Sequence, residues 1–378
     1  MSTTHRSIHW GCGMVMLALL ETSAPAESAG AWSPAGQLTV ARSRHTATRL
    51  LDGRVLVAGG QTNGPAGIVS TASVEIYDPA TRLWTPTGSL ATPRSRHAAI
   101  LLPGGNVLVV GGRNTLGATA AAEVFDPSSG SWSSTASMST PRDFHTATLL
   151  ADGRVLVAGG LATGDGKDNP AEKSAEIHDP TTGGWTPADH MAQARWGHTA
   201  TVLGDGSVLV AGGTGPALDG TYTVRAEIYH PGSNRWRSVD PMATARGFHI
   251  ASRLADGSVL VAGGLTHPHH TVNVTGASEF FDPATERWKP TGSLSVARGA
   301  GPHGAALLLD GRFLVAGGRT FTAEIYNPAT AQWQFTGSMS ISRSSHTLTL
   351  LGNGDVLAVG GENINGIIST AELFKAGQ

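Results

Sequence analysis

The feature that most constrains this chain is a sequence unit that recurs seven times. In its first copy the unit runs from the segment Arg42-x-x-His45 through Asp52-Gly53 to the apolar run Val55–Gly60, which reads VLVAGG. The terminal glycine pair returns at Gly59-Gly60, Gly111-Gly112, Gly159-Gly160, Gly212-Gly213, Gly263-Gly264, Gly317-Gly318 and Gly360-Gly361. A spacing of roughly fifty residues is typical of a four-stranded propeller blade, so seven units predict seven blades.

Each unit carries the signals of four strands. An Asp-Gly or Asn-Gly pair between the first two apolar runs predicts a tight hairpin, because both turn positions need positive φ; the second unit departs, with Gly104-Gly105. The third strand reads Glu-x-Tyr-Asp-Pro in its fullest copies, and Asp-Pro then turns the chain. One tryptophan marks the fourth strand, at Trp84, Trp132, Trp185, Trp236, Trp288 and Trp333. We expect these large rings to pack between blades.

The two ends of the repeat region complement each other. The last unit stops after its third strand, at Ala371–Phe374, so its fourth strand is missing. Residues 31–38 (AWSPAGQL) match the fourth strand of the first unit, residues 83–90 (LWTPTGSL). The N-terminal strand is therefore predicted to complete the seventh blade, which leaves no open sheet edge in the ring. The prediction is an all-β chain in which residues 27–378 form a single closed seven-bladed propeller.

The combined pattern of Arg-x-x-His, Gly-Gly, Glu-x-Tyr-Asp-Pro and Trp resembles the kelch repeat. The resemblance covers essentially all of the chain after residue 26, and the Asp-Gly-Arg-Val-Leu-Val-Ala-Gly-Gly units are similar to secreted bacterial kelch proteins of the galactose-oxidase-like type. It implies a propeller whose first strands line a central channel. Because kelch propellers include both enzymes and binding modules, function has to be argued from a site.

The first 26 residues have the order of an export signal. Arg6 provides a charged flank, an apolar run follows at Met14–Leu20, and Ala24-Pro25-Ala26 is a small-residue cleavage site. This predicts a secreted or periplasmic protein, with a cytoplasmic tail as the alternative. No later stretch approaches the roughly 18 apolar residues of a membrane span, so none is expected.

Composition and residue inventory exclude several classes of function. Charged residues are only 14% of the chain and the formal net charge is −2, with no basic stripe for nucleic acid. Galactose-oxidase chemistry would imply a copper site with a cysteine-linked tyrosine. The only cysteine is Cys12, before the propeller, and three of the four tyrosines occupy the Glu-x-Tyr position. Copper-radical oxidation is therefore not expected. The chain is predicted to bind no cofactor and to be a monomer.

Strand alternation predicts where side chains of different units meet. The loops between second and third strands (b–c loops) emerge on the same face as the Arg-x-x-His segments, which we call the channel mouth. The repeated arginines, Arg142, Arg195 and Arg246 among them, and the repeated histidines are expected to ring this mouth. A seven-fold ring spreads imidazoles too widely for one metal ion, so the repeated histidines and glutamates are interpreted as architectural.

The two variable positions of the Arg-x-x-His segment differ between units. Units 1 and 2 carry Arg44 and Arg96, whereas units 3, 4 and 5 carry Phe144, Trp196 and Phe248. A basic arc beside an aromatic arc suits a sugar ring or an acidic saccharide, because rings stack on aromatics and guanidinium binds carboxylate. The alternative is that these aromatics only pack under the loops.

Further candidates lie on the long b–c loops of units 3 to 5. These are Asp165 and Asp168, then Tyr222, then His267, His269 and His270. Acids and a histidine suit general acid–base chemistry, and the His-Pro-His-His run is a weak candidate for a divalent metal site. The alternative is a polar loop without a site.

Two further arginines stand where the other units have apolar residues. Arg49 and Arg253 lie four residues after the histidine of units 1 and 5. An arginine at an inner-strand position must be paired or solvated, so both are predicted to face the channel.

The leading functional hypothesis is an exported recognition module that binds a glycan or protein over blades 3 to 5 at the channel mouth. The alternative is a carbohydrate-active enzyme of epimerase, mutarotase or lyase type acting on an acidic sugar there. Bacterial kelch propellers similar to this chain include a periplasmic sialic-acid mutarotase. A third possibility is a structural cell-surface protein without a concentrated pocket.

Overall fold

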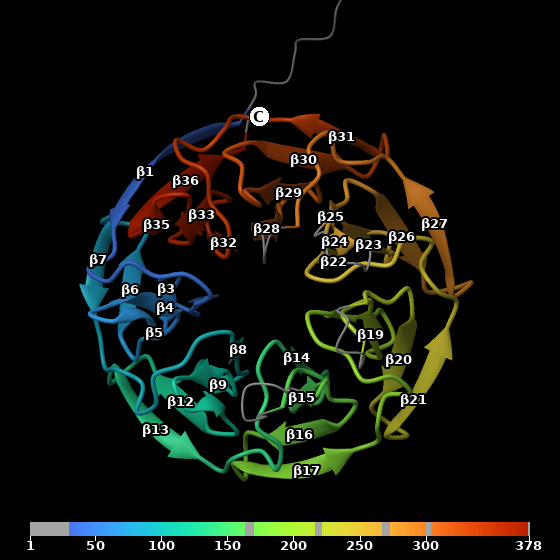
Figure 1. Cartoon of the computed structure of the whole chain (residues 1–378), viewed down its shortest axis with the longest axis horizontal. Helices are drawn as coiled ribbons and strands as arrows, with labels where there is room; N and C mark the ends of the chain where they lie inside the picture. Colours follow the sequence, from blue (N-terminus) through green and yellow to red (C-terminus); the bar gives the residue numbers. More distant parts are fainter. Residues whose placement is uncertain (1–29, 163–169, 216–220, 267–272, 300–303, 377–378) are drawn as a thin grey trace, which may run out of the picture.

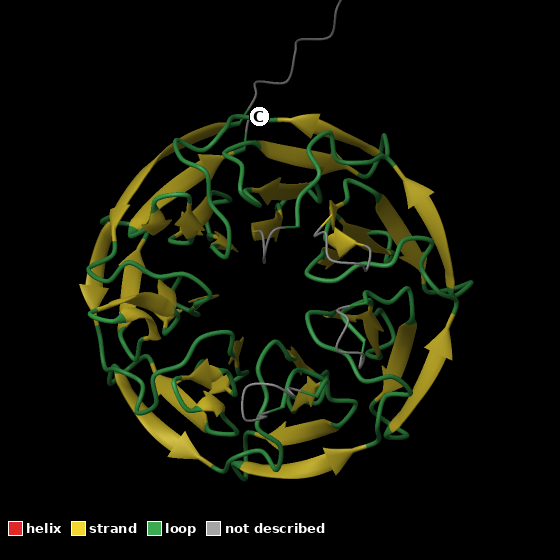
Figure 2. Ribbon diagram, viewed as in Figure 1, coloured by secondary structure: helices red, strands yellow, loops and turns green. Residues whose placement is uncertain are grey.

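The computed structural model describes residues 30–162, 170–215, 221–266, 273–299 and 304–376. Within these ranges the chain has no helix (Figure 2) and forms seven four-stranded antiparallel sheets around a central axis (Figure 1). The predicted all-β, seven-bladed propeller is confirmed. No described segment has the length and apolarity that a membrane-crossing helix needs. Residues 1–26, the predicted export signal, lie outside the described ranges.

The strands follow the chain from the axis outward in blades 1 to 6. Blade 1 is β2 (Thr46–Arg49), β3 (Val55–Ala58), β6 (Val74–Asp78) and β7 (Leu83–Pro86). Blade 2 is β8 (Ala98–Leu101), β9 (Val107–Val110), β12 (Ala122–Asp126) and β13 (Ser131–Thr135). Blade 3 is β14 (Thr146–Leu149), β15 (Val155–Ala158), β16 (Ala175–Asp179) and β17 (Gly184–Ala188). Blade 4 is β18 (Thr199–Val202), β19 (Val208–Ala211), β20 (Ala226–His230) and β21 (Arg235–Val239).

Blades 5 to 7 continue the ring. Blade 5 is β22 (Ile250–Arg253), β23 (Val259–Ala262), β26 (Ser278–Asp282) and β27 (Arg287–Thr291). Blade 6 is β28 (Gly304–Leu307), β29 (Phe313–Ala316), β30 (Ala323–Asn327) and β31 (Gln332–Phe335). Blade 7 is β32 (Thr347–Leu350), β33 (Val356–Val359), β36 (Thr370–Lys375) and β1 (Ala31–Gln37). Short hairpins form four b–c loops: β4 (Gln61–Gly64) with β5 (Gly67–Ser70), β10 (Arg113–Asn114) with β11 (Gly117–Ala118), β24 (Leu265–Thr266) with β25 (Asn273–Val274), and β34 (Glu362–Asn363) with β35 (Gly366–Ile367).

The ring closes as the ends of the repeat predict. Strand β1 pairs antiparallel with β36, with Trp32 opposite Phe374, and so becomes the outermost strand of blade 7 (Figure 1). N-terminal and C-terminal segments therefore share one sheet, and the edge of β36 is covered.

The core lies between neighbouring blades. The four residues of each second strand are buried, as a continuous apolar run predicts, and Val55 and Val57 of blade 1 pack in one cluster with Leu357 and Val359 of blade 7. The tryptophans bridge blades, since the Trp84 ring nitrogen donates a hydrogen bond to the Ala35 carbonyl at 2.9 Å. The same type of bond to a neighbouring blade is made by Trp32, Trp132, Trp185, Trp236 and Trp288.

Candidate functional site

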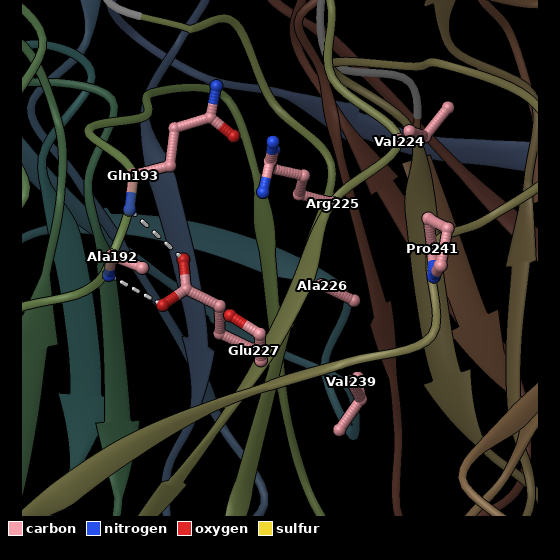
Figure 3. Close-up of a pocket in the computed structure, with 9 residues that line it drawn as sticks. Ala192, Gln193, Val224, Arg225, Ala226, Glu227, Val239 and Pro241 are labelled. Carbon is pink, nitrogen blue, oxygen red and sulfur yellow. Dashed lines mark hydrogen bonds between the residues drawn. The ribbon is translucent and has the colours of Figure 1, made fainter.

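The repeated arginines are buried structural groups. Arg195 is fully buried and its guanidinium lies 2.7 Å from Glu227 Oε1, while a second guanidinium nitrogen donates to two backbone carbonyls. Glu227 also accepts the backbone N–H groups of Ala192 and Gln193 (Figure 3). Burial lowers the pKa of Arg195 while Glu227 opposes that shift. The same pair recurs in every blade: Arg42–Glu75, Arg94–Glu123, Arg142–Glu176, Arg246–Glu279, Arg298–Glu324 and Arg343–Glu372.

These contacts correct one sequence-based expectation. Arg142, Arg195 and Arg246 were expected at the channel mouth as ligand-binding groups, but each has no exposed surface and is paired with a glutamate. A guanidinium that is buried inside the blade and paired with a glutamate stabilises the fold and is not presented to a ligand.

The repeated histidines join neighbouring blades. Thr46 Oγ1, at the start of the innermost strand of blade 1, lies 2.9 Å from His97 Nε2 of blade 2. Equivalent contacts link Thr146 with His198, Thr199 with His249, and Thr347 with His45. Burial lowers the pKa of His97 to about 3, so this imidazole is neutral near pH 7. These contacts agree with the architectural interpretation, and no cluster of three metal-ligating side chains is found in the described ranges.

A continuous backbone belt encircles much of the channel mouth. In six blades the third residue of the Arg-x-x-His segment has a φ of +52° to +60°. These residues, which we call the collar, are Ser345, Arg44, Arg96, Phe144, Gly197 and Phe248. The N–H of Arg44 donates to Ser345 O at 2.9 Å, and Arg96 N–H to Arg44 O at 3.0 Å. The belt continues through Phe144 and Gly197 to Phe248. Sequence reasoning missed this conformation, because most collar residues are not glycine.

The aromatic side chains predicted to form one arc do come together. Ring centroids lie 5.5 Å apart for Phe144–Trp196, 5.2 Å for Phe144–Phe248 and 5.3 Å for Trp196–Phe248. Two of these contacts are T-shaped and the third is tilted, so the rings pack against one another instead of forming a flat platform. The Tyr222 ring lies against the backbone of Gly247, next to Phe248 in sequence, since a β-carbon built on Gly247 would lie 2.7 Å from it.

The basic arc touches the aromatic arc directly. The guanidinium carbon of Arg96 lies 4.6 Å from the centre of the Phe144 ring, which is a cation–π contact. Arg96 is also 3.6 Å from the buried carboxylate of Asp143, which Arg113 holds more closely, at 2.8 Å. Burial raises the pKa of Asp143, and the two arginines oppose that shift. Sequence reasoning had not assigned a role to Asp143 or Arg113.

A cavity of about 220 Å³ lies at this junction. It is lined by Arg44, Arg96, Phe144, Ser345, Thr347 and the histidines His45, His97, His145 and His346. Its walls come from blades 7, 1, 2 and 3, so it overlaps the predicted position over blades 3 to 5 only at Phe144 and His145 of blade 3. Arg44 is held by Glu362 at 3.4 Å, longer than the 2.6–2.9 Å of the buried pairs.

The remaining candidates do not join this cavity. Arg49 and Arg253 are exposed at the ends of β2 and β22 that adjoin the Asp-Gly turns, on the face opposite the channel mouth. A β-carbon built on Gly352 of blade 7 would lie 2.7 Å from Arg49 Nη2, so this arginine reaches over a neighbouring turn. They are therefore not part of a mouth site. Asp165, Asp168, His267, His269 and His270 lie outside the described residues.

Larger cavities lie away from the collar. One of about 550 Å³ is formed within blade 4 by residues such as Gln193, Arg225 and Val239 (Figure 3). Another of about 670 Å³ lies between the b–c hairpins of blades 7 and 1 and includes Arg319 and Glu362. Ile364, which also lines this cavity, is 97% exposed at the hairpin tip, which is unusual for a large apolar side chain.

Comparison with known proteins supports the kelch resemblance. The kelch motif model matches residues 42–91, 94–139 and 195–243. Kelch-like protein 36 of Rattus norvegicus is 27% identical over 160 residues, which are 42% of this chain and 25% of that protein. Kelch-like protein terF of Aspergillus terreus is 29% identical over 152 residues, 38% of this chain and 32% of that protein. Kelch-like ECH-associated protein 1B of Danio rerio is 31% identical over 96 residues, 25% of this chain and 16% of that protein. The chain thus spans a third or less of the length of these relatives.

Among solved structures, a fungal alcohol oxidase of the AA5 family in complex with copper has a similar fold. The TM-score is 0.73 at 17% identity, and the match covers 92% of this chain and 77% of that one. At this identity the likeness concerns the fold alone. That the chain is of the secreted bacterial, galactose-oxidase-like type stays a prediction. The kelch motifs, the kelch-like relatives and the seven-bladed ring together support a kelch-repeat propeller.

Proposed function

We propose that this propeller is a recognition module that binds an acidic saccharide at the channel mouth. The observation that carries the proposal is the cavity in which Arg44 and Arg96 lie beside the Phe144 ring. Their carboxylate partners are 3.4 and 3.6 Å away, so neither guanidinium is engaged as tightly as the buried arginines are. A ligand carboxylate would offer both guanidinium groups a closer acceptor than these partners do.

The size of the cavity limits what enters it. At about 220 Å³ it is smaller than the roughly 300–1,000 Å³ of ordinary small-molecule pockets. One sugar ring or one terminal acidic group fits this space, and the rest of a chain would lie over the collar. The aromatic cluster of Phe144, Trp196 and Phe248 adjoins the cavity and offers ring edges to the neighbouring sugar.

The test is calorimetric titration of the full chain with D-glucuronate and D-galacturonate, with neutral D-glucose as the control ligand. Arg96→Ala is expected to weaken binding of the acidic sugars at least about tenfold, the loss of one charge-assisted hydrogen bond. Arg54→Ala is the matched control, because Arg54 pairs with Asp52 at an exposed turn. If neither D-glucuronate nor D-galacturonate binds, the proposal is wrong. Nuclear magnetic resonance of the same samples reports any mutarotation or cleavage, which would instead support the enzymatic alternative.

A protein ligand is the second candidate, favoured by a separate observation on the same face. Leu116 and Ile364 are 90% and 97% exposed in the b–c hairpins of blades 2 and 7, and Ile68 of blade 1 is 60% exposed. Exposed apolar side chains of this size are typical of protein-binding surfaces. One kelch-like relative is named as an ECH-associated protein. Leu116→Asp and Ile364→Asp are expected to abolish binding of a purified partner, whereas Leu309→Asp on the opposite face leaves it unchanged.

We also propose that residues 1–26 direct export, on the sequence order of charge, apolar run and small residues. Cell fractionation followed by N-terminal sequencing tests this. A periplasmic or secreted product that begins at Glu27 is expected, and an unprocessed cytoplasmic chain would contradict it.

A further inference from the structure

The threonine–histidine contacts do not join every pair of neighbouring blades. In four blades the residue after the repeated histidine is a threonine whose hydroxyl bonds the histidine of the next blade: Thr46, Thr146, Thr199 and Thr347. The other three blades have Ala98, Ile250 and Gly304 at this position. Because blade 2 has Ala98, His145 of blade 3 lacks the hydroxyl that His97, His198 and His249 have. Its Nε2 makes no hydrogen bond with any described residue, although the residue is only 8% exposed.

A buried imidazole nitrogen without a partner is rare and requires an explanation. Burial lowers the pKa of His145 to about 3, so the ring is neutral near pH 7 and its Nε2 offers one hydrogen bond as donor or acceptor. Compared with the threonine of four other blades, Ala98 lacks a hydroxyl and a methyl group next to His145. His145 lines the 220 Å³ cavity together with Arg44, Arg96 and Phe144.

We infer that a ligand hydroxyl takes the place of the missing threonine hydroxyl on His145 Nε2 while the ligand's carboxylate lies between Arg44 and Arg96. The inference rests on the proposed function and narrows it, because the ligand must then be a hydroxy acid of the uronate type. A carboxylic acid without hydroxyl groups would meet the two guanidinium groups but leave His145 unpaired. The site then favours hydroxy acids over other carboxylic acids, because a ligand without a hydroxyl leaves His145 Nε2 without a hydrogen bond in the complex.

The test gives His145 Nε2 a hydrogen-bond partner from within the protein. Ala98→Thr is expected to cap His145 and weaken D-glucuronate binding about tenfold, while cyclohexanecarboxylate, which has the ring and the acid but no hydroxyl, binds as before. Ala98→Val adds nearly the same volume without a hydroxyl and is expected to change glucuronate affinity less than about threefold. Thr146→Ala is the matched control, because it leaves His198 without its hydroxyl partner and His198 does not line the cavity. Its affinity for glucuronate is expected to equal that of the unmodified chain.

A second variant covers the case in which Ala98→Thr does not fold. His145→Phe removes both ring nitrogens and is expected to produce the same selective loss of glucuronate binding. The inference is overturned if glucuronate binds Ala98→Thr as tightly as the unmodified chain, since solvent alone then occupies the position, or if the valine and threonine variants lose affinity equally. If the unmodified chain binds neither acid, the proposed function itself is wrong, so the two failures are distinguishable.

Discussion

At the scale of single residues, Glu227 shows how this fold tolerates buried charge. Its carboxylate accepts bonds from the Arg195 guanidinium and from the N–H groups of Ala192 and Gln193. One side chain thus ties the third strand of blade 4 to the segment that leads into its first strand. Arginine and glutamate recur in every unit of the sequence, but their pairing is visible only when the blade is assembled.

Glu227→Gln is expected to lower the free energy of unfolding by about 3–5 kcal/mol, because it leaves Arg195 as an uncompensated buried charge. Urea unfolding followed by tryptophan fluorescence measures this. The control is Asp52→Asn at the exposed Asp52–Arg54 pair, where a loss of about 0–1 kcal/mol is expected. Equal losses in the two variants would contradict a structural role for the buried pair.

The threonine–histidine contacts predict opposite effects at two equivalent positions. Thr46→Ala is expected to destabilise the chain by about 1–3 kcal/mol, since it leaves His97 Nε2 buried without its partner. Ala98→Thr gives His145 such a partner and is expected to stabilise the ligand-free chain by about 0.5–1.5 kcal/mol. Thermal unfolding of both variants tests the prediction. If the two unfolding midpoints shift in the same direction, the predicted opposite effects are wrong.

The same histidines make stability depend on pH. The pKa values of His97 and His145 are lowered to about 3 by burial, whereas unfolded histidine titrates near its ordinary value of about 6.5. Between these values the unfolded chain binds more protons, so stability falls as pH decreases below about 6.5 and is constant above it. From pH 7 to pH 5 the two residues are expected to remove about 4 kcal/mol. A flat urea-unfolding profile over that range would contradict the neutral state of these imidazoles.

At the scale of the element, the glycine pair after each second strand allows close approach of two segments. Gly60 has a φ of +104°, and a β-carbon there would lie 2.7 Å from Ser43 O in the Arg-x-x-His segment. The sequence predicts this approach, because a glycine pair ends the apolar run in every unit.

Gly60→Ala is therefore expected to destabilise the chain by about 1–3 kcal/mol more than Gly53→Ala. Gly53 has a similar φ of +90° but no atom within 4 Å of a built β-carbon, so it isolates the backbone cost from the steric cost. Denaturant midpoints of the two variants provide the measurement, and equal midpoints would show that crowding at Gly60 is absent.

At the scale of the whole molecule, stability depends on closing the ring with β1. Deletion of residues 1–39 removes β1 and exposes the edge of β36, which in the intact chain pairs along its length with β1. An open edge strand recruits other chains, so this variant is expected to form oligomers and to lose its single cooperative unfolding transition. Size-exclusion chromatography and calorimetry test this. Deletion of residues 1–26, which retains β1, is the control; a monomeric 40–378 chain with an unchanged midpoint would contradict the prediction.

The sequence alone determined the blade number, the strand order, the turns and the closure, because periodic apolar runs, Asp-Gly pairs and complementary ends are local signals that repetition reinforces. The sequence also predicted that Phe144, Trp196 and Phe248 lie in one arc. It did not distinguish the two arginines of one segment: Arg42 is fully buried against Glu75, whereas Arg44 lines the cavity. Only the tertiary structure decided this, because Arg44 adopts a positive φ in a belt of hydrogen bonds between blades, and neither its residue type nor its spacing encodes that conformation. The contacts of Arg96 with Phe144 and of Thr46 with His97 likewise join residues about fifty positions apart in sequence, so they exist only once the ring is assembled.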